Sequence, residues 1–432
     1  MAMRDMGEIT YWLRIPERTR PAAREAGFLP ALCFSALIFL VFIGPWPPIL
    51  SGDYGGEEVA AGTGDAVRQA SFVLLFALVA STVAFTRGAR HLLDVPLPLA
   101  VLLFWAWLSL AWAVDPATSL RRVLLTSMVL LSVCWTVAML GHERVLRQLG
   151  LWFAAILVLN WAVMPLVETA VHQHGELDEA LVGNWRGIHD HKNAAGAFCA
   201  IAILTFLHLT ARTRSWLLGP VLILMAAVFL VMTASKTSLG LVGVAILGGL
   251  AFEAGYRNPG LRNVALVLGG CAILLAAAFF GDRIPDVVAF FEDPGSLTGR
   301  VQIWPVLLEY AANNLLLGSG YGSFWAIGPA SPLHEYATGW VTTVTHGHNG
   351  YLDLLVQLGL VGLLLGLLVL VLLPVRALLS EPLHAPGARW LLGALFVFLW
   401  LHNLLETSFL DRANMMWVMF LTAYALLHRR AR

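Results

Sequence analysis

The feature that most constrains this chain is its series of long apolar segments, which recur between residues 28 and 427. Most contain roughly 18 to 24 residues, the length of helix that crosses about 30 Å of hydrocarbon. Charged residues make up only 12% of the chain and hydrophobic residues 59%, whereas a soluble globular protein has about a quarter charged residues. The pattern therefore predicts an all-α polytopic membrane protein.

We predict about 12 transmembrane helices, the first of which should end within 42–50, where prolines interrupt the hydrogen-bond ladder. Their expected limits are 28–50, 69–86, 95–113, 122–140, 148–168, 193–210, 215–233, 238–253, 263–281, 350–373, 388–405 and 412–427. The expected organisation is a cytoplasmic N-terminal segment (1–27), helices 1–9 (28–281), a large periplasmic loop containing an interfacial helix (282–349), and helices 10–12 with a short cytoplasmic tail (350–432).

Lys and Arg residues set the expected orientation, because cytoplasmic loops carry the excess of positive charge. Of the 27 basic residues, 18 fall in one alternate set of loops that includes both chain ends. This set is expected to be cytoplasmic, with both termini inside. The nine basic residues that remain on the outer face are Arg68, Arg121, Arg122, Arg186, Lys192, Lys236, Arg283, Arg300 and Arg412.

Basic residues on the outer face need a reason, and binding of a phosphate or pyrophosphate group supplies one. A guanidinium fork matches phosphate oxygens and remains charged. Arg186 and Arg300 stand in glycine-flanked segments, so we expect them to hold pyrophosphate, whereas Lys236 either joins them or only terminates a helix. A solvated or headgroup-facing side chain is the simpler interpretation for Arg121, Arg122 and Arg283.

Three His-x-His pairs also lie on the expected outer face: His172 and His174, His189 and His191, and His346 and His348. Metal binding is one interpretation, but residues two apart on a helix face different directions, and no Cys or HExxH motif accompanies them. General-base chemistry is the other, and it favours His348, which enters an apolar helix beside Asn349. We therefore predict no metal site. Zero net charge implies no nucleic-acid partner.

Several segments together resemble the O-antigen ligase and polysaccharide polymerase superfamily. The stretch "HNGYLDLLVQLGLVG" fits its pattern H-[NSQ]-x9-G-x2-G through His348, Asn349, Gly359 and Gly362. The segments "SLAWAVDP", "TASKTSL" and "TGRVQIW" are similar to other blocks of the family, and "WRGIHDHKNAAG" is similar to its ExoQ-type exopolysaccharide polymerases. Leu363 stands where the pattern usually has Gly, Thr or Tyr.

This resemblance implies an inverting GT-C glycosyltransferase in a bacterial inner membrane, with its active site facing the periplasm and no metal or other cofactor. The implied donor is an undecaprenyl-pyrophosphate-linked glycan. His348 would be the base, with Arg300, Arg186 and Lys236 at the pyrophosphate. Further contacts to sugar or acceptor are expected from Asn349, His346, His191, Lys192 and Asn193.

The acceptor separates two versions of this function. A polymerase would extend a second lipid-linked glycan, whereas a ligase would transfer the glycan to lipid A–core. The "HKN" segment and Leu363 favour the polymerase. A transporter or metal-handling protein using the His-x-His pairs is the alternative from another class. A transporter should show charged residues at mid-membrane, and the two acids considered, Asp353 and Glu406, fall near the outer ends of helices.

Overall fold

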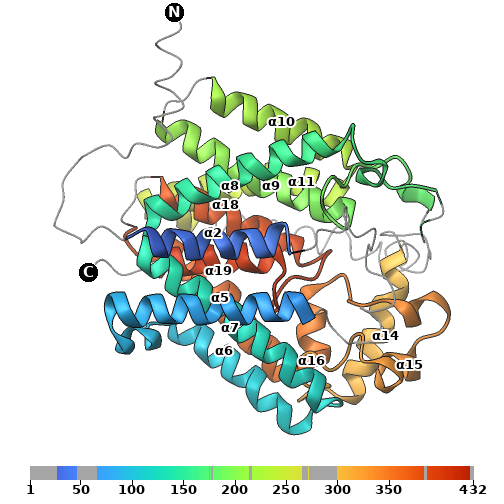
Figure 1. Ribbon diagram of the computed structural model, residues 1–432. Coiled ribbons are helices and arrows are strands. Elements are labelled where there is room, and N and C mark those ends of the chain that lie inside the picture. The colour runs from blue at the N-terminus through green and yellow to red at the C-terminus, as the bar shows by residue number, and fades with distance from the viewer. Residues whose placement is uncertain are drawn as a thin grey trace, which may run out of the picture.

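The computed structural model describes residues 27–45, 66–174, 176, 179–213, 217–264, 271, 299–383 and 387–428. Within these ranges the chain is helical (Figure 1) and forms no strand, apart from one isolated bridge between Val171 and Trp185. The expectation of an all-α protein is confirmed for the part described. The chain termini and Arg283 lie outside it.

The helices that correspond to expected spans are α2 (Phe28–Phe42), α5 (Ala66–Arg87), α6 (Leu97–Leu108), α7 (Pro116–Leu140), α8 (His142–Val163), α9 (Lys192–Thr213), α10 (Leu218–Met232), α11 (Lys236–Arg257), α16 (Gly350–Gly366) continued by α17 (Leu373–Ser380), α18 (Ala388–His402) and α19 (Met415–Leu427). A π-helical stretch, η8 (Leu367–Leu372), joins α16 to α17. The outer segments contain α14 (Arg300–Asn313) and α15 (Leu333–Tyr336). Short 3₁₀ turns are η1 (Ala89–Leu93), η2 (Ser109–Trp112), η3 (Glu168–Ala170), η4 (Glu179–Leu181), η6 (Gly328–Ala330) and η7 (Gly339–Thr343).

Eleven of the expected spans thus coincide with helices in the described ranges, and the ninth, 263–281, falls almost entirely outside them. Six helices are long and apolar enough to cross a membrane, and five more are apolar but shorter. The length and apolar composition of these helices are those of a membrane protein. The number of crossings, the division at residues 282 and 350, and the interfacial position of α14 remain predictions.

Helix limits differ from the expected ones where polar residues form the ends. Helices α7 and α8 begin at residues 116 and 142 rather than 122 and 148. Asp115 caps α7 by accepting from the backbone N–H of Thr118 at 3.1 Å, and this cap extends the helix beyond its apolar run. Helix α2 ends at Phe42, earlier than residue 50 and close to Pro45.

Helices α7, α9 and α19 form the interior of the bundle. Helix α9 packs against α8, α10, α11 and α18, and α7 packs against α2, α5 and α19. Most of the apolar stretch of α9 is buried, whereas less than a third of the apolar stretches of α5 and α11 is buried. The exposed helices thus surround a core to which the ends of α9 and α18 belong, and these ends carry the polar residues described below.

The described part of the predicted outer loop, residues 299–349, has a small apolar core of its own. Ile303 and Leu307 of α14 pack with Phe324 and Trp325, against Val356 of α16. Figure 1 shows α14 and α15 beside α16 at one edge of the molecule. This separate core indicates that residues 299–349 form a small folded unit, here called the outer cap, rather than a simple connection.

Arg122 of α7 binds the outer cap. The residue is 8% exposed, and its guanidinium donates to the carbonyl oxygens of Gly322, Trp325 and Ala326 at 2.6 to 2.9 Å. The expectation that Arg122 is a solvated or headgroup-facing side chain is wrong. The sequence concealed this because the carbonyls that it binds lie 200 residues further along the chain.

Gly359, one of the two fixed glycines of the sequence pattern, explains the shape of α16. Gly359 has φ 68° and ψ −173°, which interrupts the helix, and a Cβ there would stand 2.1 Å from the carbonyl oxygen of Leu316. The backbone N–H of Leu360 donates to Leu315 at 2.7 Å across this contact. The part that follows, residues 360–380, is by itself about the 20 residues needed to cross a membrane.

Candidate functional site

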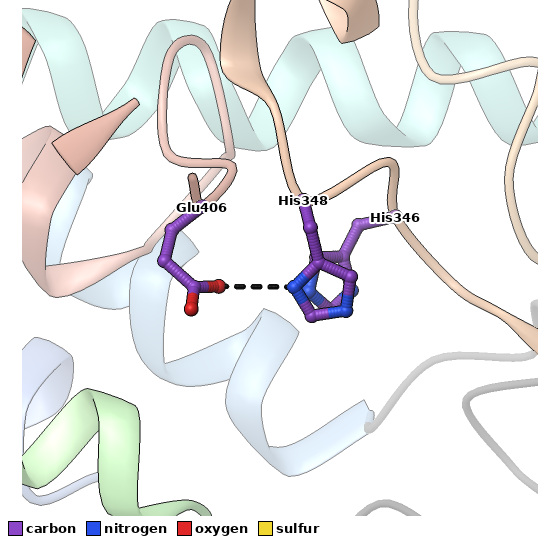
Figure 2. Close-up of side chains that lie close together, drawn as sticks. All are labelled: His346, His348 and Glu406. Carbon is purple, nitrogen blue, oxygen red and sulfur yellow. Dashed lines mark hydrogen bonds and ion pairs between the residues drawn. The ribbon is translucent and has the colours of Figure 1, made fainter. Parts of the chain in front are cut away.

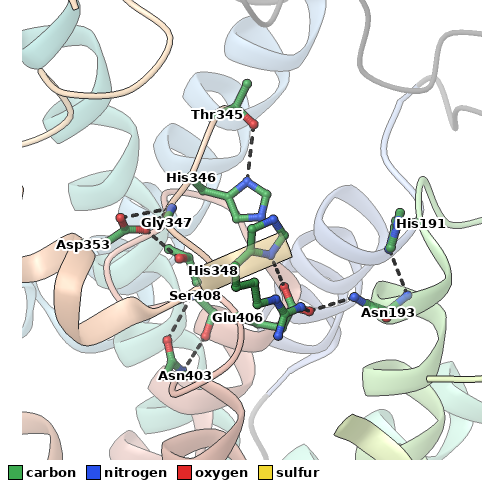
Figure 3. Close-up of polar contacts among 12 residues, drawn as sticks. His191, Asn193, Thr345, His346, Gly347, His348, Asp353, Asn403, Glu406 and Ser408 are labelled. Carbon is green, nitrogen blue, oxygen red and sulfur yellow. Dashed lines mark hydrogen bonds and ion pairs between the residues drawn. The ribbon is translucent and has the colours of Figure 1, made fainter. Parts of the chain in front are cut away.

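Glu406 lies at the centre of the site, in the turn that follows α18. Its side chain is 12% exposed and is met by groups from three other parts of the chain (Figure 3). Arg300, the first residue of α14, donates to Oε1 at 2.5 Å, and Asn193, in the first turn of α9, donates to Oε1 at 2.8 Å. The Nδ1 atom of His348 lies 3.1 Å from Oε2. One carboxylate therefore joins the segments that the sequence singled out separately.

His348 is held in an uncommon backbone conformation. Its φ is +49°, a left-handed value that a residue other than glycine adopts rarely and that often accompanies function. Gly350 follows closely, where a Cβ would stand 2.2 Å from the side-chain oxygen of Asn403. The "HGHNG" segment is thus pressed against the turn that carries Glu406, so that the imidazole meets the carboxylate.

The hydrogen bond with Glu406 assigns the proton on His348. An ionised carboxylate only accepts, so Nδ1 carries the hydrogen, and in the neutral imidazole Nε2 then keeps its lone pair. The side chain of His348 is 25% exposed, which leaves the ring accessible from outside. Burial would raise the pKa of Glu406, but the hydrogen bond from His348 and the charge of Arg300 outweigh it and hold the pKa well below its usual value. The arrangement is a carboxylate–imidazole pair in which Nε2 can accept a proton.

His346 lies directly against His348, with ring centroids 4.1 Å apart (Figure 2). Burial lowers the pKa of His346 to about 3, and the neighbouring His348 adds to this effect. Its ring is therefore neutral at physiological pH. Together His346, His348 and Glu406 offer nitrogen and oxygen ligand atoms within 4.8 Å of one another. The spacing argument against metal binding assumed a helical segment, whereas this turn brings both rings to one side.

Asp353 supports both halves of the site from behind. It is 1% exposed and accepts from the backbone N–H of Gly347 at 3.2 Å and from the hydroxyl of Thr407 at 2.6 Å. Trp325 donates to the same carboxylate at 2.9 Å. Gly347 separates the two histidines and Thr407 follows Glu406, so Asp353 fixes the distance between imidazole and carboxylate.

Asn349 acts as a helix cap in this structure. Its side-chain oxygen accepts from the backbone N–H groups of Tyr351 and Leu352, both at 3.1 Å, and so begins α16. A contact with sugar, as expected from the sequence, remains a prediction for the amide nitrogen. Asn and Ser, two of the three residues that the sequence pattern allows here, are common N-caps.

The "HKN" segment contributes the first turn of α9. Asn193 reaches Glu406, as described above, and its backbone N–H donates to the ring of His191 at 3.1 Å. Burial lowers the pKa of His191 to about 4, and the nearby His172 adds to this effect. Lys192 extends toward the backbone oxygen of Ala234 at 3.5 Å, in the turn before α11. The structure therefore brings Asn193 and His191 near Glu406 and His348, whereas the side chain of Lys192 approaches Ala234. Contacts of all three residues with sugar or acceptor remain predictions.

Arg186 and Lys236 have different surroundings from Arg300. Arg186 is 2% exposed and forms a bidentate ion pair with Glu176, at 2.9 and 3.2 Å, while it also donates to the backbone oxygen of Thr169. Lys236 is exposed at the start of α11. Pyrophosphate binding by Arg186 would compete with Glu176. Both roles remain predictions, but among the arginines and lysines that the structure describes, Arg300 is the one in contact with Glu406.

Glu406 is the residue that sequence reasoning missed. It was considered only as an acid near the outer end of a helix, and its partners Arg300 and His348 lie 106 and 58 residues earlier in the chain. A signal was present, because an acid among outer-face arginines and histidines invites pairing. No spacing rule could have selected which acid.

Comparisons with known proteins agree with the resemblance seen in the sequence. Residues 221–367 match the family model described as O-antigen ligase. The chain is also 23% identical over 377 residues to the exopolysaccharide production protein ExoQ of Rhizobium meliloti (strain 1021), covering 82% of this chain and 76% of that protein. The expected relationship to the O-antigen ligase and polysaccharide polymerase superfamily is confirmed. Arg300 and His348 fall within the family match, whereas Glu406 lies beyond its end.

Proposed function

We propose that this chain, a relative of the O-antigen ligases, is an inverting membrane glycosyltransferase that works without a metal. Its donor would be an undecaprenyl-pyrophosphate-linked glycan, and its acceptor a hydroxyl group of a second molecule. The enzyme would lie in the inner membrane of a bacterium, with both termini in the cytoplasm and the site of His348 and Glu406 facing the periplasm. The family match and the apolar helices support the membrane and glycan setting.

The hydrogen bond between His348 and Glu406 is the observation that carries the proposal. It keeps a proton on Nδ1 and leaves Nε2 of the neutral ring as the base, on a side chain that is a quarter exposed. In the proposed reaction, Nε2 takes the proton of the acceptor hydroxyl while the hydroxyl oxygen bonds to the anomeric carbon of the donor glycan. The bond from that carbon to the pyrophosphate oxygen breaks on the opposite side, which inverts the configuration. Glu406 stabilises the imidazolium that forms.

Arg300 supplies the positive charge that the leaving pyrophosphate needs. Negative charge develops on that group as the bond breaks, and a fixed guanidinium can stabilise it in place of a metal ion. Arg300 holds Glu406 through Nη2, and a guanidinium carries five N–H donors in a fork. One arginine can therefore join the base and the leaving group in a single arrangement.

Polymerase activity is the version we favour. The "HKN" segment begins α9 at the site, and the curated relative that matches most of the chain is named for exopolysaccharide production. The family description names the ligase, so transfer to lipid A–core is the second candidate. A common donor and base would serve both, and the acceptor alone distinguishes them.

The test uses the purified full-length protein in lipid nanodiscs with the lipid-linked glycan isolated from its native membranes. One reaction contains only that glycan, and a second also contains lipid A–core. Both contain excess EDTA. A ladder of longer lipid-linked glycans in the first reaction supports the polymerase, and glycan on lipid A–core in the second supports the ligase. Transfer to neither acceptor by folded protein contradicts the proposal, and transfer only after a divalent metal is restored contradicts its metal independence.

A further inference from the structure

The His346–His348 pair and Glu406 form a ready donor set for a transition metal. Two imidazoles and one carboxylate converge within 4.8 Å, on the same side of the "HGH" turn (Figure 2). This combination of ligands is one that Zn²⁺ accepts in catalytic sites, where a fourth position stays open. Within the residues that the structure describes, this is the group of three that meets such a distance.

The other two His-x-His pairs are arranged differently. His172 and His174 each bind a separate acid, Glu176 at 2.7 Å and Glu179 at 3.0 Å. The ring of His189 approaches the side chain of Asn160 at 3.4 Å. Within the described ranges, residues 346 and 348 are the pair in which both rings offer a ligand atom within 4.8 Å of one carboxylate oxygen.

We propose that His346, His348 and Glu406 bind a zinc ion, and that this ion inhibits the enzyme instead of serving it. The binding site stands on the geometry alone, whereas inhibition rests on the proposed function.

Inhibition follows from where the proton on His348 must go. The metal would replace the hydrogen that now lies between Nδ1 and Glu406 Oε2. If the imidazole stays neutral, its proton moves to Nε2, and the lone pair that should accept the acceptor's proton is lost. If the proton leaves to solvent, the bound metal still withdraws the ring's basicity. Either outcome separates His348 from its proposed role as a base.

Arg300 makes this a weak site rather than a permanent one. Its guanidinium lies 2.5 Å from the other oxygen of Glu406, so it repels a divalent cation bound to Oε2. Removal of that charge should therefore strengthen metal binding. This opposite effect of ligand and arginine substitutions distinguishes the proposed site from any other zinc site on the protein.

The binding test uses untagged full-length protein, treated with EDTA and then freed of it, and titrates Zn²⁺ against a chromophoric chelator. His346→Gln should weaken zinc binding by at least the about 10- to 100-fold that loss of an outer partner of a metal site costs. Arg300→Gln should strengthen it, and His174→Gln, which changes an exposed histidine outside the cluster, should leave it unchanged. Equal affinity of the wild type and His346→Gln overturns the site.

The inhibition test measures glycan transfer by the wild type over the same zinc concentrations. Transfer should fall as the site fills and recover when EDTA is added. Full transfer at saturating zinc overturns the inhibitory role, and so does activation by zinc. If the folded protein transfers no glycan at any zinc concentration, the proposed function fails and inhibition fails with it, while the binding titration still decides the site.

Discussion

Replacement of Glu406 by Gln tests the role of the residue that the sequence did not reveal. The side chains have the same shape, but the amide has one accepting oxygen and one donating nitrogen. Arg300 and Asn193 both donate to Oε1, so the amide oxygen must remain there. The NH₂ group then faces His348, whose Nδ1 must become an acceptor. The proton moves to Nε2, and the imidazole holds the tautomer that cannot act as a base.

The expected loss follows from that change. General-base catalysis contributes about 10²- to 10⁴-fold to a rate, so kcat for glycan transfer should fall by about this factor, or about 3 to 5 kcal/mol in activation free energy. Arg300 also loses its charged partner while it is 8% exposed, and breaking a buried ion pair costs about 3 to 5 kcal/mol of stability. The retained hydrogen bond to the amide oxygen should make the observed loss of stability smaller.

The assay compares Glu406→Gln with Glu309→Gln, which changes an exposed acid on α14. Initial rates of transfer are measured over a range of donor concentrations, and each variant's folding is checked by its melting temperature in the same detergent. Glu309→Gln should match the wild type. A folded Glu406→Gln protein with at least a tenth of the wild-type kcat would refute the reasoning that this carboxylate sets the tautomer of His348.

Three further results are expected. Asp353→Asn should lower kcat by about 10- to 100-fold, because the amide cannot accept from all the donors of Asp353 and the "HGH" turn can then shift. Asp190→Asn changes an exposed acid and should change kcat little. Initial rates of transfer test this, and equal kcat values for the two variants would contradict it. Gly359→Ala should cost at least about 2 kcal/mol of stability, because residue 359 has a left-handed φ and lies against the Leu316 oxygen. Gly240→Ala has open space around it and should cost less. Melting temperatures that fall equally in the two variants, or in neither, argue against the interruption of α16 at residue 359. Burial lowers the pKa of His346 to about 3 and that of His191 to about 4, below the usual 6.5 of imidazole. As the pH falls, the unfolded chain therefore binds protons at these histidines before the folded chain does. The free energy of unfolding should decrease below about pH 6.5, by about 2 kcal/mol for each histidine at pH 5. The melting temperature should therefore be lower at pH 5 than at pH 7.5, and the decrease should be smaller in His346→Gln; an equal decrease in both proteins rejects this source.

The helices were predictable because each depends on a local property. A long apolar run identifies a helix wherever it occurs. The limits of the helices were less predictable, as at the start of α7, which the Asp115 cap sets, and at the end of α2, close to Pro45. The cap formed by Asn349 was open to the same reasoning, since Asn before an apolar helix is a common N-cap. The expected contact with sugar concerns the same side chain, whose oxygen the cap already occupies.

The candidate site was predictable only in part because its contacts are long-range. His346, His348 and Arg300 stood out through type, spacing and position on the outer face. Their convergence on Glu406 depends on how α9, α14 and α18 end beside one another, which no local pattern contains. The left-handed backbone of His348 was not predictable from the sequence either. It brings the rings of His346 and His348 together, whereas a helix would have separated them.

The central claim is that His348 is the base for glycan transfer, and its most direct test is the transfer rate of His348→Ala. The control is His334→Ala, which removes an exposed histidine from the same outer loop. Both proteins are assayed in EDTA with the lipid-linked donor at saturating concentration, after donor binding has been measured separately. The account predicts that His348→Ala binds the donor normally but transfers glycan at least about 10²-fold more slowly, while His334→Ala matches the wild type. Transfer by His348→Ala at close to the wild-type rate would contradict it.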